Sequence, residues 1–433
     1  MPRIVCNFAY LYSTIGMKKN ILLAALLLPL ALLAQHRPTD PFAAAKRAGL
    51  DTVYFTRIDS LCNSGIAQHI FPGCQVLVAY RGQVVYQRGY GRQTYDASSP
   101  MVNTHTVYDL ASLTKVSATT FALMRLFDEH KIALDDPLSK HLPYLKGTNK
   151  ERITIRQAMS HIARLKASEF YWKKVGPDGS RLSFPDAKGD IQQCRQQVLD
   201  LIARSDLNKD SKYVYSDLGF ILLGDLVERV SGQPLDRYMA DNFYRPLGMT
   251  STSFRPRLNG IDTLRIAPTE VDNYFRHRLI RGEVHDQNCA SMGGVAGHAG
   301  LFSTAHDLWM LYQMYLDSGS FRGKRYFAPS TAVTFNKQYF LSQGCRRALG
   351  FDKPYAQPRK GGSTAPEVSQ ASFGHTGFTG TMVWCDPKYN LVYIFLSNRT
   401  YPDSHAPNKL ASSHLRQEIQ SVAYQAILHP KKK

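Results

Sequence analysis

Cysteine is scarce in this chain of 433 residues, and the few cysteines are widely separated. There are seven, and none forms a C-x-x-C pair, so neither a cysteine-based zinc site nor a thioredoxin-like motif is indicated. A chain of this length can bury a large core without a disulfide framework. We therefore expect buried free thiols at the six cysteines beyond the N-terminal segment, Cys62, Cys74, Cys194, Cys289, Cys345 and Cys385.

Acidic residues are also few, with 34 Asp and Glu against 53 Lys and Arg, which gives a formal net charge of +19. Loss of the first 34 residues would remove Arg3, Lys18 and Lys19 and no acid, so the remaining chain stays basic. This charge fits attraction to an anionic polymer such as cell wall, and it fits a solvated basic surface equally well. We do not expect nucleic acid as a partner, because the chain carries an export signal.

Long apolar runs are absent apart from one near the N-terminus. Lys18 and Lys19 precede the uncharged run from Ile21 to Ala34, which is shorter than the ~20 residues that a spanning helix needs. The pattern predicts a signal peptide over residues 1–35, with Met17 as the working start, and an exported protein that is periplasmic or secreted. An N-terminal membrane anchor is the alternative. After cleavage we expect no stable membrane span.

The pattern of apolar residues predicts strands near both ends of the chain and helices between them. The simplest fold is α/β (α+β), an antiparallel sheet from both termini, flanked by helices, with an inserted helical lobe. Residues 36–105 and 309–433 would form the α/β lobe and residues 106–308 the mainly helical lobe. The segments that carry this prediction are helices near residues 57–70, 121–127, 220–230 and 414–428 and strands at 74–80, 84–86, 381–385 and 391–396.

Ser112 and Lys115 form a candidate catalytic pair. A spacing of three puts both side chains on one face of a helix. A serine hydroxyl is a weak nucleophile at neutral pH, and a partly desolvated amine within hydrogen-bond reach can activate it. The start of a helix also supplies free N–H groups that stabilise a developing oxyanion.

Two further motifs follow in the order that such chemistry requires, Tyr215-Ser216-Asp217 and His375-Thr376-Gly377. With these motifs the chain resembles the serine β-lactamase and penicillin-binding protein superfamily, in particular its class C β-lactamase-like branch, over nearly the full length that follows the signal. The resemblance implies a hydrolase that forms an acyl-enzyme and needs no cofactor or metal.

The resemblance also implies a role for each residue. Ser112 would be the acylated nucleophile, and Lys115 would maintain the protonation states of the groups around it. Tyr215 would be the general base and later the general acid. The amides of Ser112 and Phe378 would form the oxyanion hole. Substrate would bind along Asp217, His375, Thr376 and Gly377. Whether Lys115 or Tyr215 is the main base stays open.

The sequence departs from the β-lactamase pattern at His375, at Asp217 and over residues 160–165, where relatives often have a small-Gly-Leu ending. His375 stands where the family usually has Lys, and a histidine is mostly neutral at pH 7, so carboxylate recognition should weaken. Asp217 stands where the family usually has Asn, and an anion near Lys115 favours the protonated amine, which makes Tyr215 the better base. These changes point away from β-lactam hydrolysis and toward an amidase or esterase.

Three other stretches resemble exported N-acetylmuramoyl-L-alanine amidases: residues 266–270, 284–288 and 293–304. The glycines of the last stretch are expected to make tight turns. His285, Asp286 and His298 are conceivable metal ligands, but no H-E-x-x-H motif exists and the serine chemistry requires no metal.

We therefore expect an exported serine hydrolase that cleaves an amide or ester, plausibly as a peptidoglycan-fragment amidase. The alternatives are a D,D-carboxypeptidase or β-lactamase, a small-ester esterase, and a catalytically silent cell-wall-binding module. The partner is a small-molecule or peptidoglycan-fragment substrate. The oligomeric state is left open.

Overall fold

The computed structural model describes residues 40–175, 188–356 and 362–430, so the expected signal segment and residues 176–187 lie outside the described part. The chain divides into Met1–Ala43 and Ala44–Lys433, and the description below concerns the second unit. Within the described residues, no helix is both long enough and apolar enough to cross a membrane.

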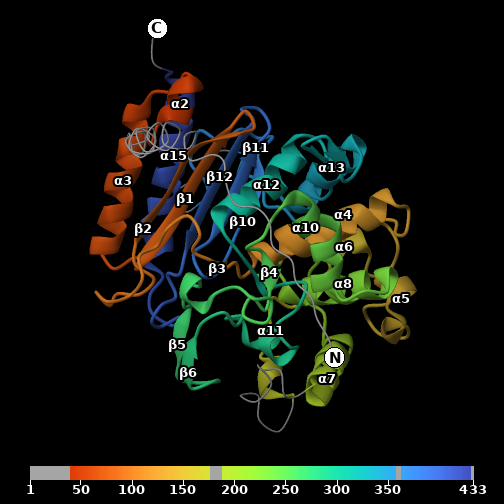
Figure 1. The fold of residues 1–433 in the computed structure, drawn as a ribbon. Helices are drawn as coiled ribbons and strands as arrows, with labels where there is room; N and C mark the ends of the chain where they lie inside the picture. The colour runs from red at the N-terminus through yellow and green to blue at the C-terminus, as the bar shows by residue number, and fades with distance from the viewer. Residues whose placement is uncertain (1–39, 176–187, 357–361, 431–433) are drawn as a thin grey trace, which may run out of the picture. The chain divides into compact units, whose positions relative to one another are not determined.

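A five-stranded antiparallel sheet forms the centre of this unit, with the strand order β10-β11-β12-β1-β2 (Figure 1). The neighbouring strands β12 and β1 come from opposite ends of the sequence, and Cys74 of β1 pairs with Ser397 of β12. The prediction of one sheet built from both termini is thus confirmed. The strands are β1 (Gly73–Tyr80), β2 (Gln83–Gly91), β10 (Phe373–Thr376), β11 (Met382–Asp386) and β12 (Leu391–Ser397).

Helices cover both faces of the sheet, which explains why its central strands are mostly apolar. Helices α3 (Thr52–Ala67) and α15 (Leu415–Leu428) pack against each other and against β2 and β12, while α12 (Ala305–Leu316) packs against β1 and β12 from the opposite face (Figure 1). Every residue of β12 is buried, as expected for a strand that is covered on both sides. The six cysteines predicted as buried thiols are free and buried.

The first helix was predicted over residues 57–70, and its bounds were wrong at both ends. Helix α3 begins at Thr52 because the side chain of Asp51 accepts a hydrogen bond from the Val53 amide and caps it. It ends at Ala67, since His69 adopts a left-handed backbone with φ of 53°. The apolar stripe that suggested the helix shows which residues are buried but does not fix its ends.

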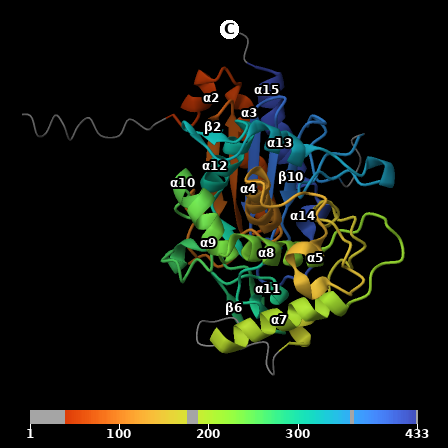
Figure 2. The same ribbon diagram turned by 90° about the vertical axis from the view of Figure 1, so that its right-hand side faces the viewer.

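The middle of the chain contributes most of the remaining helices, several of which lie in front of the sheet in Figure 2. They surround α8 (Asp217–Ser231), which is buried along most of its length. The lobe boundaries at 105 and 308 stay a prediction. The other helices are α2 (Ala43–Arg47), α4 (Thr120–Asp128), α5 (Leu138–His141), α6 (Ile155–Met159), α7 (Lys188–Arg204), α9 (Leu235–Met239), α10 (Arg245–Leu247), α11 (Gln287–Ser291), α13 (Pro329–Asn336) and α14 (Lys409–Ser412).

Several short strands lie between the helices in the chain, and one of them, β3, comes just before the start of the candidate site. In a three-stranded sheet of order β3-β7-β4, β7 is the middle strand, and Ser112 lies three residues after β3 ends. The short strands are β3 (Tyr108–Asp109), β4 (Ser253–Phe254), β5 (Glu270–Asp272), β6 (Arg278–Ile280), β7 (Leu301–Ser303), β8 (Ser320–Phe321) and β9 (Lys324–Arg325).

The glycines of residues 293–300 serve two different purposes. Gly293, Gly294 and Gly300 have positive φ angles and make the expected turns. Gly297 instead packs against the backbone of α8, where a Cβ atom would lie 2.0 Å from the Phe220 carbonyl oxygen. This close approach of two backbones holds the loop, and the carbonyl of the next residue, His298, against the helix.

Gly297→Ala should lower the free energy of unfolding by about 3 kcal/mol, because the added methyl group overlaps the backbone of α8. Urea unfolding followed by circular dichroism measures this change. Gly219→Ala on the same helix is the matched control, since its Cβ would meet its nearest neighbour at 3.4 Å. Equal stability of the two variants would contradict the packing argument.

Candidate active site

Ser112 lies in a strained turn directly after β3. Ala111 has a φ of 47°, a conformation that costs an L-residue roughly 1 kcal/mol. The Asp109 carboxylate holds this turn by accepting hydrogen bonds from the Ala111 amide at 2.8 Å and from the His285 amide at 2.6 Å. The serine is therefore placed by a buried carboxylate that it does not contact.

The segment after Ser112 is helical, as the sequence predicts, but it begins unusually. Residues Lys115–Thr119 form one π-helical turn before α4 starts at Thr120, and such turns are frequent at functional sites. The predicted contact between Ser112 and Lys115 is present, since Lys115 Nζ lies 3.1 Å from Ser112 Oγ. The Lys115 side chain is completely buried.

Lys115 is held as an ammonium ion by its neighbours. Its Nζ lies 2.7 Å from Asp217 Oδ1 and donates a hydrogen bond to the His298 carbonyl at 3.1 Å. Burial lowers the pKa of Lys115, but Asp217 and Tyr215 outweigh burial, so the pKa is raised above its ordinary value. A charged Lys115 cannot take the serine proton, so the geometry favours Tyr215 as the base.

The Tyr215 ring lies among cationic and imidazole side chains. Lys115 Nζ and the Arg347 guanidinium carbon are each 5.1 Å from the centre of the ring, and the His161 ring centre is 4.6 Å away. The Tyr215 hydroxyl is buried and makes no hydrogen bond of acceptable geometry to a described residue. A phenolate at Tyr215, which is the form that a general base requires, would face two positive charges.

His161 is a site residue that the sequence reasoning missed. Its Nδ1 accepts a hydrogen bond from the Ser216 amide at 3.0 Å, so in the neutral ring the proton is on Nε2. His375 has the opposite tautomer, because its Nδ1 donates to the Thr376 carbonyl at 2.7 Å. Both Nε2 atoms are buried and without a partner among the described residues. Motif spacing could not have found His161, which reaches Tyr215 from the residues after α6.

Both histidines are neutral at physiological pH. Burial, followed by the charges of Arg347 and Lys115, lowers the pKa of His161 and of His375 well below the ordinary value. The expectation that His375 supplies no permanent positive charge therefore agrees with its surroundings.

A cavity of about 510 Å³ brings most of the predicted residues together. Asp217 does not line it, and instead pairs with Lys115. The amides of Ser112 and Phe378 donate no hydrogen bond within the described part of the chain, so both are available for an oxyanion. The predicted residues on the cavity wall are Ser112, Tyr215, His375, Thr376, Gly377 and Phe378. Their roles stay predictions.

Four arginines on the cavity wall were not predicted: Arg346, Arg347, Arg399 and Arg416. The replacement of the motif lysine by His375 led us to expect weak carboxylate recognition. The cavity nevertheless carries positive charge, which comes from segments after α13, after β12 and at the start of α15. No local sequence pattern connects these segments, because the fold alone brings them to one cavity.

The three conceivable metal ligands make ordinary polar contacts. His298 Nε2 lies 2.9 Å from Asp286 Oδ1, and His285 Nε2 lies 3.2 Å from Glu270 Oε1. Within residues 40–175, 188–356 and 362–430, no group of three or more His, Cys, Asp or Glu side chains is arranged to hold a metal ion. His285 also stacks on Phe378, with ring centres 5.4 Å apart.

The fold, and the way it brings Ser112, Lys115 and Tyr215 together, fit a serine hydrolase. A family model described as Beta-lactamase matches residues 58–416, and the chain belongs to this family. A protein of Escherichia coli (strain K12) named "Putative D-alanyl-D-alanine carboxypeptidase" is 32% identical over 427 residues, covering 91% of this chain and 93% of that protein. A protein of the same name from Salmonella gallinarum is 31% identical over 414 residues, covering 88% and 92%.

Solved structures agree with the fold. "EstCE1, a hydrolase with promiscuous acyltransferase activity" has a TM-score of 0.64 at 23% identity and covers 86% of this chain and 98% of that chain. The octameric penicillin-binding protein homologue from Pyrococcus abyssi has a TM-score of 0.58 at 19% identity, with coverage of 83% and 76%. These likenesses confirm the serine β-lactamase-like α/β fold.

Tyr215→Phe should separate catalysis from stability. Because the hydroxyl has no well-formed hydrogen bond, its removal should leave the melting temperature nearly unchanged, while loss of a general base should lower kcat by roughly 10²–10⁴-fold. Nitrophenyl-ester hydrolysis and thermal melting measure the two effects. A variant with full turnover would remove tyrosine from the mechanism.

Stability should fall as the pH drops below the ordinary histidine pKa of about 6.5. His161 and His375 take up protons there in the unfolded chain but not in the folded one, whereas above that pH both states are neutral. Each histidine should contribute up to about 1.4 kcal/mol per pH unit. Urea unfolding from pH 8 to pH 5 should therefore show a shallower loss for His375→Asn than for the wild type. Identical slopes would mean that His375 takes up its proton over the same pH range in the folded and the unfolded chain.

Proposed function

We propose that this protein is a serine D,D-carboxypeptidase, which releases the C-terminal residue of a short peptide through an acyl-enzyme at Ser112. One observation carries the proposal: Ser112 and Tyr215 line a cavity whose wall is rich in arginine, and the charged Lys115 lies beside both. The names of the two curated relatives support this substrate class.

The proposed reaction assigns one proton path. Tyr215 begins the cycle as a phenolate, beside the charges of Lys115 and Arg347. Ser112 Oγ attacks the carbonyl carbon while its proton passes to the Tyr215 phenolate oxygen, and the oxyanion binds the amides of Ser112 and Phe378. Tyr215 then gives the proton to the leaving amine as the C–N bond breaks. Water attacks the acyl-serine with Tyr215 again as base, and the acid and Ser112 are released. Lys115 keeps its charge throughout and stabilises the negative oxygen atoms.

Positive charge lies where a leaving amino acid would place its carboxylate. Arg347 contacts the Tyr215 ring and donates from Nε to the Tyr213 hydroxyl at 2.9 Å. Arg346 lies next to it, and both interact with Asp352, at 2.7 Å and 3.7 Å. These guanidinium groups would replace the cation that the family usually has at position 375.

The muramoyl-alanine amidase suggested by three sequence stretches is the second candidate. Such an amidase would use the same nucleophile, Ser112, but would cleave a different bond of the substrate, so its products would differ from those of a carboxypeptidase. We also keep export from the cytoplasm as a proposal, on the basis of the apolar run after Lys18 and Lys19.

Ser112→Ala should abolish both covalent labelling by a fluorophosphonate and all turnover. We would incubate the wild type, Ser112→Ala and the exposed control Ser330→Ala with diacetyl-L-lysyl-D-alanyl-D-alanine and with a muramoyl peptide, and identify products by mass. Free D-alanine from the wild type and from Ser330→Ala would support the carboxypeptidase. Release of an intact peptide from the muramoyl group would replace it with the amidase, and the absence of labelling and products would refute both.

A further inference from the structure

Two of the four arginines, Arg399 and Arg416, lie beside the turn that follows β10. Arg399 Nε donates to the Phe378 carbonyl at 2.7 Å, and its guanidinium carbon lies 4.3 Å from the centre of the Phe378 ring. Arg416, in the first turn of α15, donates from Nη1 to the Thr381 carbonyl at 3.2 Å. Both side chains are partly buried and line the Ser112 cavity.

The charges of Arg399 and Arg416 are not compensated within the described part of the chain. Neither forms an ion pair there with an acidic side chain, and Nε of Arg416 is buried without a hydrogen-bond partner. Burial lowers the pKa of each to about 10, and the charge of Arg399 contributes to the lowering at Arg416. Both remain charged at neutral pH, and the N-terminal end of α15 adds further positive potential. Such a group of cations is unfavourable unless an anion binds beside it.

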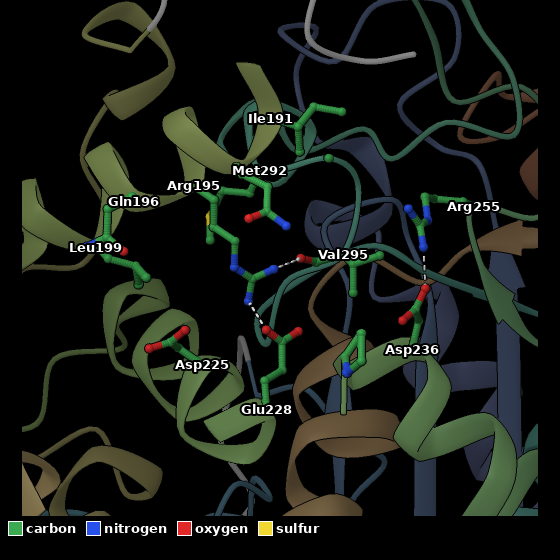
Figure 3. A pocket seen from close by; sticks show the side chains of 13 residues that line it. Ile191, Arg195, Gln196, Leu199, Asp225, Glu228, Asp236, Arg255, Met292 and Val295 are labelled. Carbon is green, nitrogen blue, oxygen red and sulfur yellow. Dashed lines mark hydrogen bonds and ion pairs between the residues drawn. The ribbon is translucent and has the colours of Figure 1, made fainter. Parts of the chain in front are cut away.

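Other arginines near cavities have acidic partners. Arg346 and Arg347 interact with Asp352. A second cavity, of about 410 Å³ beside α7 and α8, shows the same arrangement (Figure 3). There Arg195 pairs with Glu228 at 2.6 Å and Arg255 pairs with Asp236 (Figure 3). The arginines of that second cavity are already paired with acidic side chains, so they need no bound anion.

The position of the two arginines identifies the part of the substrate that they face. In the proposed reaction Tyr215 protonates the leaving group, so the leaving group lies on the side of Tyr215 and Arg347. The acyl carbonyl oxygen lies at the Phe378 amide. Arg399 donates to the carbonyl of Phe378 itself and Arg416 to that of Thr381, and neither contacts Tyr215 in the described part of the chain, so we place both along the acyl part of the substrate.

We infer that Arg399 and Arg416 form a binding site for a carboxylate carried by the acyl part of the substrate. The substrate class is then acidic, such as a peptide with a side-chain carboxylate close to the amino-terminal side of the cleaved bond. The inference rests on the proposed acyl-serine reaction for its orientation, while binding of the anion itself requires only the two guanidinium groups.

A matched pair of esters tests this site in the wild-type protein. 4-Nitrophenyl hydrogen glutarate and 4-nitrophenyl valerate have the same leaving group and similar acyl chains, but only the glutarate ends in a carboxylate. We expect kcat/KM to favour the glutarate ester by about tenfold or more, and the preference to shrink as salt rises. Equal kcat/KM values would overturn the inference and leave the hydrolase intact.

Variants that remove positive charge show which residues cause the preference for the glutarate ester. Arg399→Gln/Arg416→Gln should abolish it, whereas Lys324→Gln/Lys337→Gln, which removes the same net charge from exposed positions outside the cavity lining, should keep it. If the double variant does not fold, Arg399→Gln alone should reduce the preference. A preference that survives in a folded Arg399→Gln/Arg416→Gln protein would overturn the inference.

A direct measurement of glutarate binding tests this site independently of the proposed reaction. Calorimetry with glutarate on the Ser112→Ala protein should show binding that disappears when Arg399→Gln/Arg416→Gln is added. Glutarate binding without hydrolysis of either ester by the wild type would refute the proposed function and support the site. If glutarate does not bind and the wild type hydrolyses both esters at the same rate, the site is refuted and the hydrolase is supported.

Discussion

The buried ion pair between Lys115 and Asp217 is the interaction on which the rest of the site depends. An ammonium ion with no exposed surface is tolerable only with close partners, and Asp217 Oδ1, the His298 carbonyl and Ser112 Oγ each lie within 3.1 Å of Nζ. These partners come from the start of α8, from the loop held by Gly297 and from the turn after β3. One charged group therefore holds three segments in their relative positions, and its charge is the reason that we propose Tyr215 as the base.

The environment around that pair is electropositive, and the imidazoles do not add to it. His161 and His375 stay neutral because burial and the nearby cations both oppose protonation. Their tautomers differ because one ring accepts from an amide and the other donates to a carbonyl. Near the Tyr215 ring the structure thus places one N–H group and one lone pair that no described residue uses, so the site offers both a donor and an acceptor.

The sequence predicted those features that depend on local periodicity or on short spacings. The apolar runs at both ends indicated the antiparallel sheet, and the spacing of Ser112 and Lys115 indicated that they meet on one helical face. Helix ends were less predictable, because the start of α3 depends on the Asp51 cap and its end on a left-handed His69. The arginines on the cavity wall and His161 could not be predicted, since they reach the site only through contacts between segments far apart in the chain. Gly297 looked like a turn residue, and its true constraint is the backbone of another element.

The pairing of β1 with β12 has a consequence for the order in which the protein can fold. These two strands join Cys74 to Ser397, so the sheet cannot close until nearly all of the chain has left the ribosome. Closing so large a loop makes folding slow, because contacts of high sequence separation form late. The helices between the strands can form earlier, but until β12 and α15 arrive the β12 edge of β1 has no partner strand and α3 lacks its contact with α15. Such a chain is accessible to chaperones throughout its synthesis, and it can complete its fold only after its final strand has been synthesised.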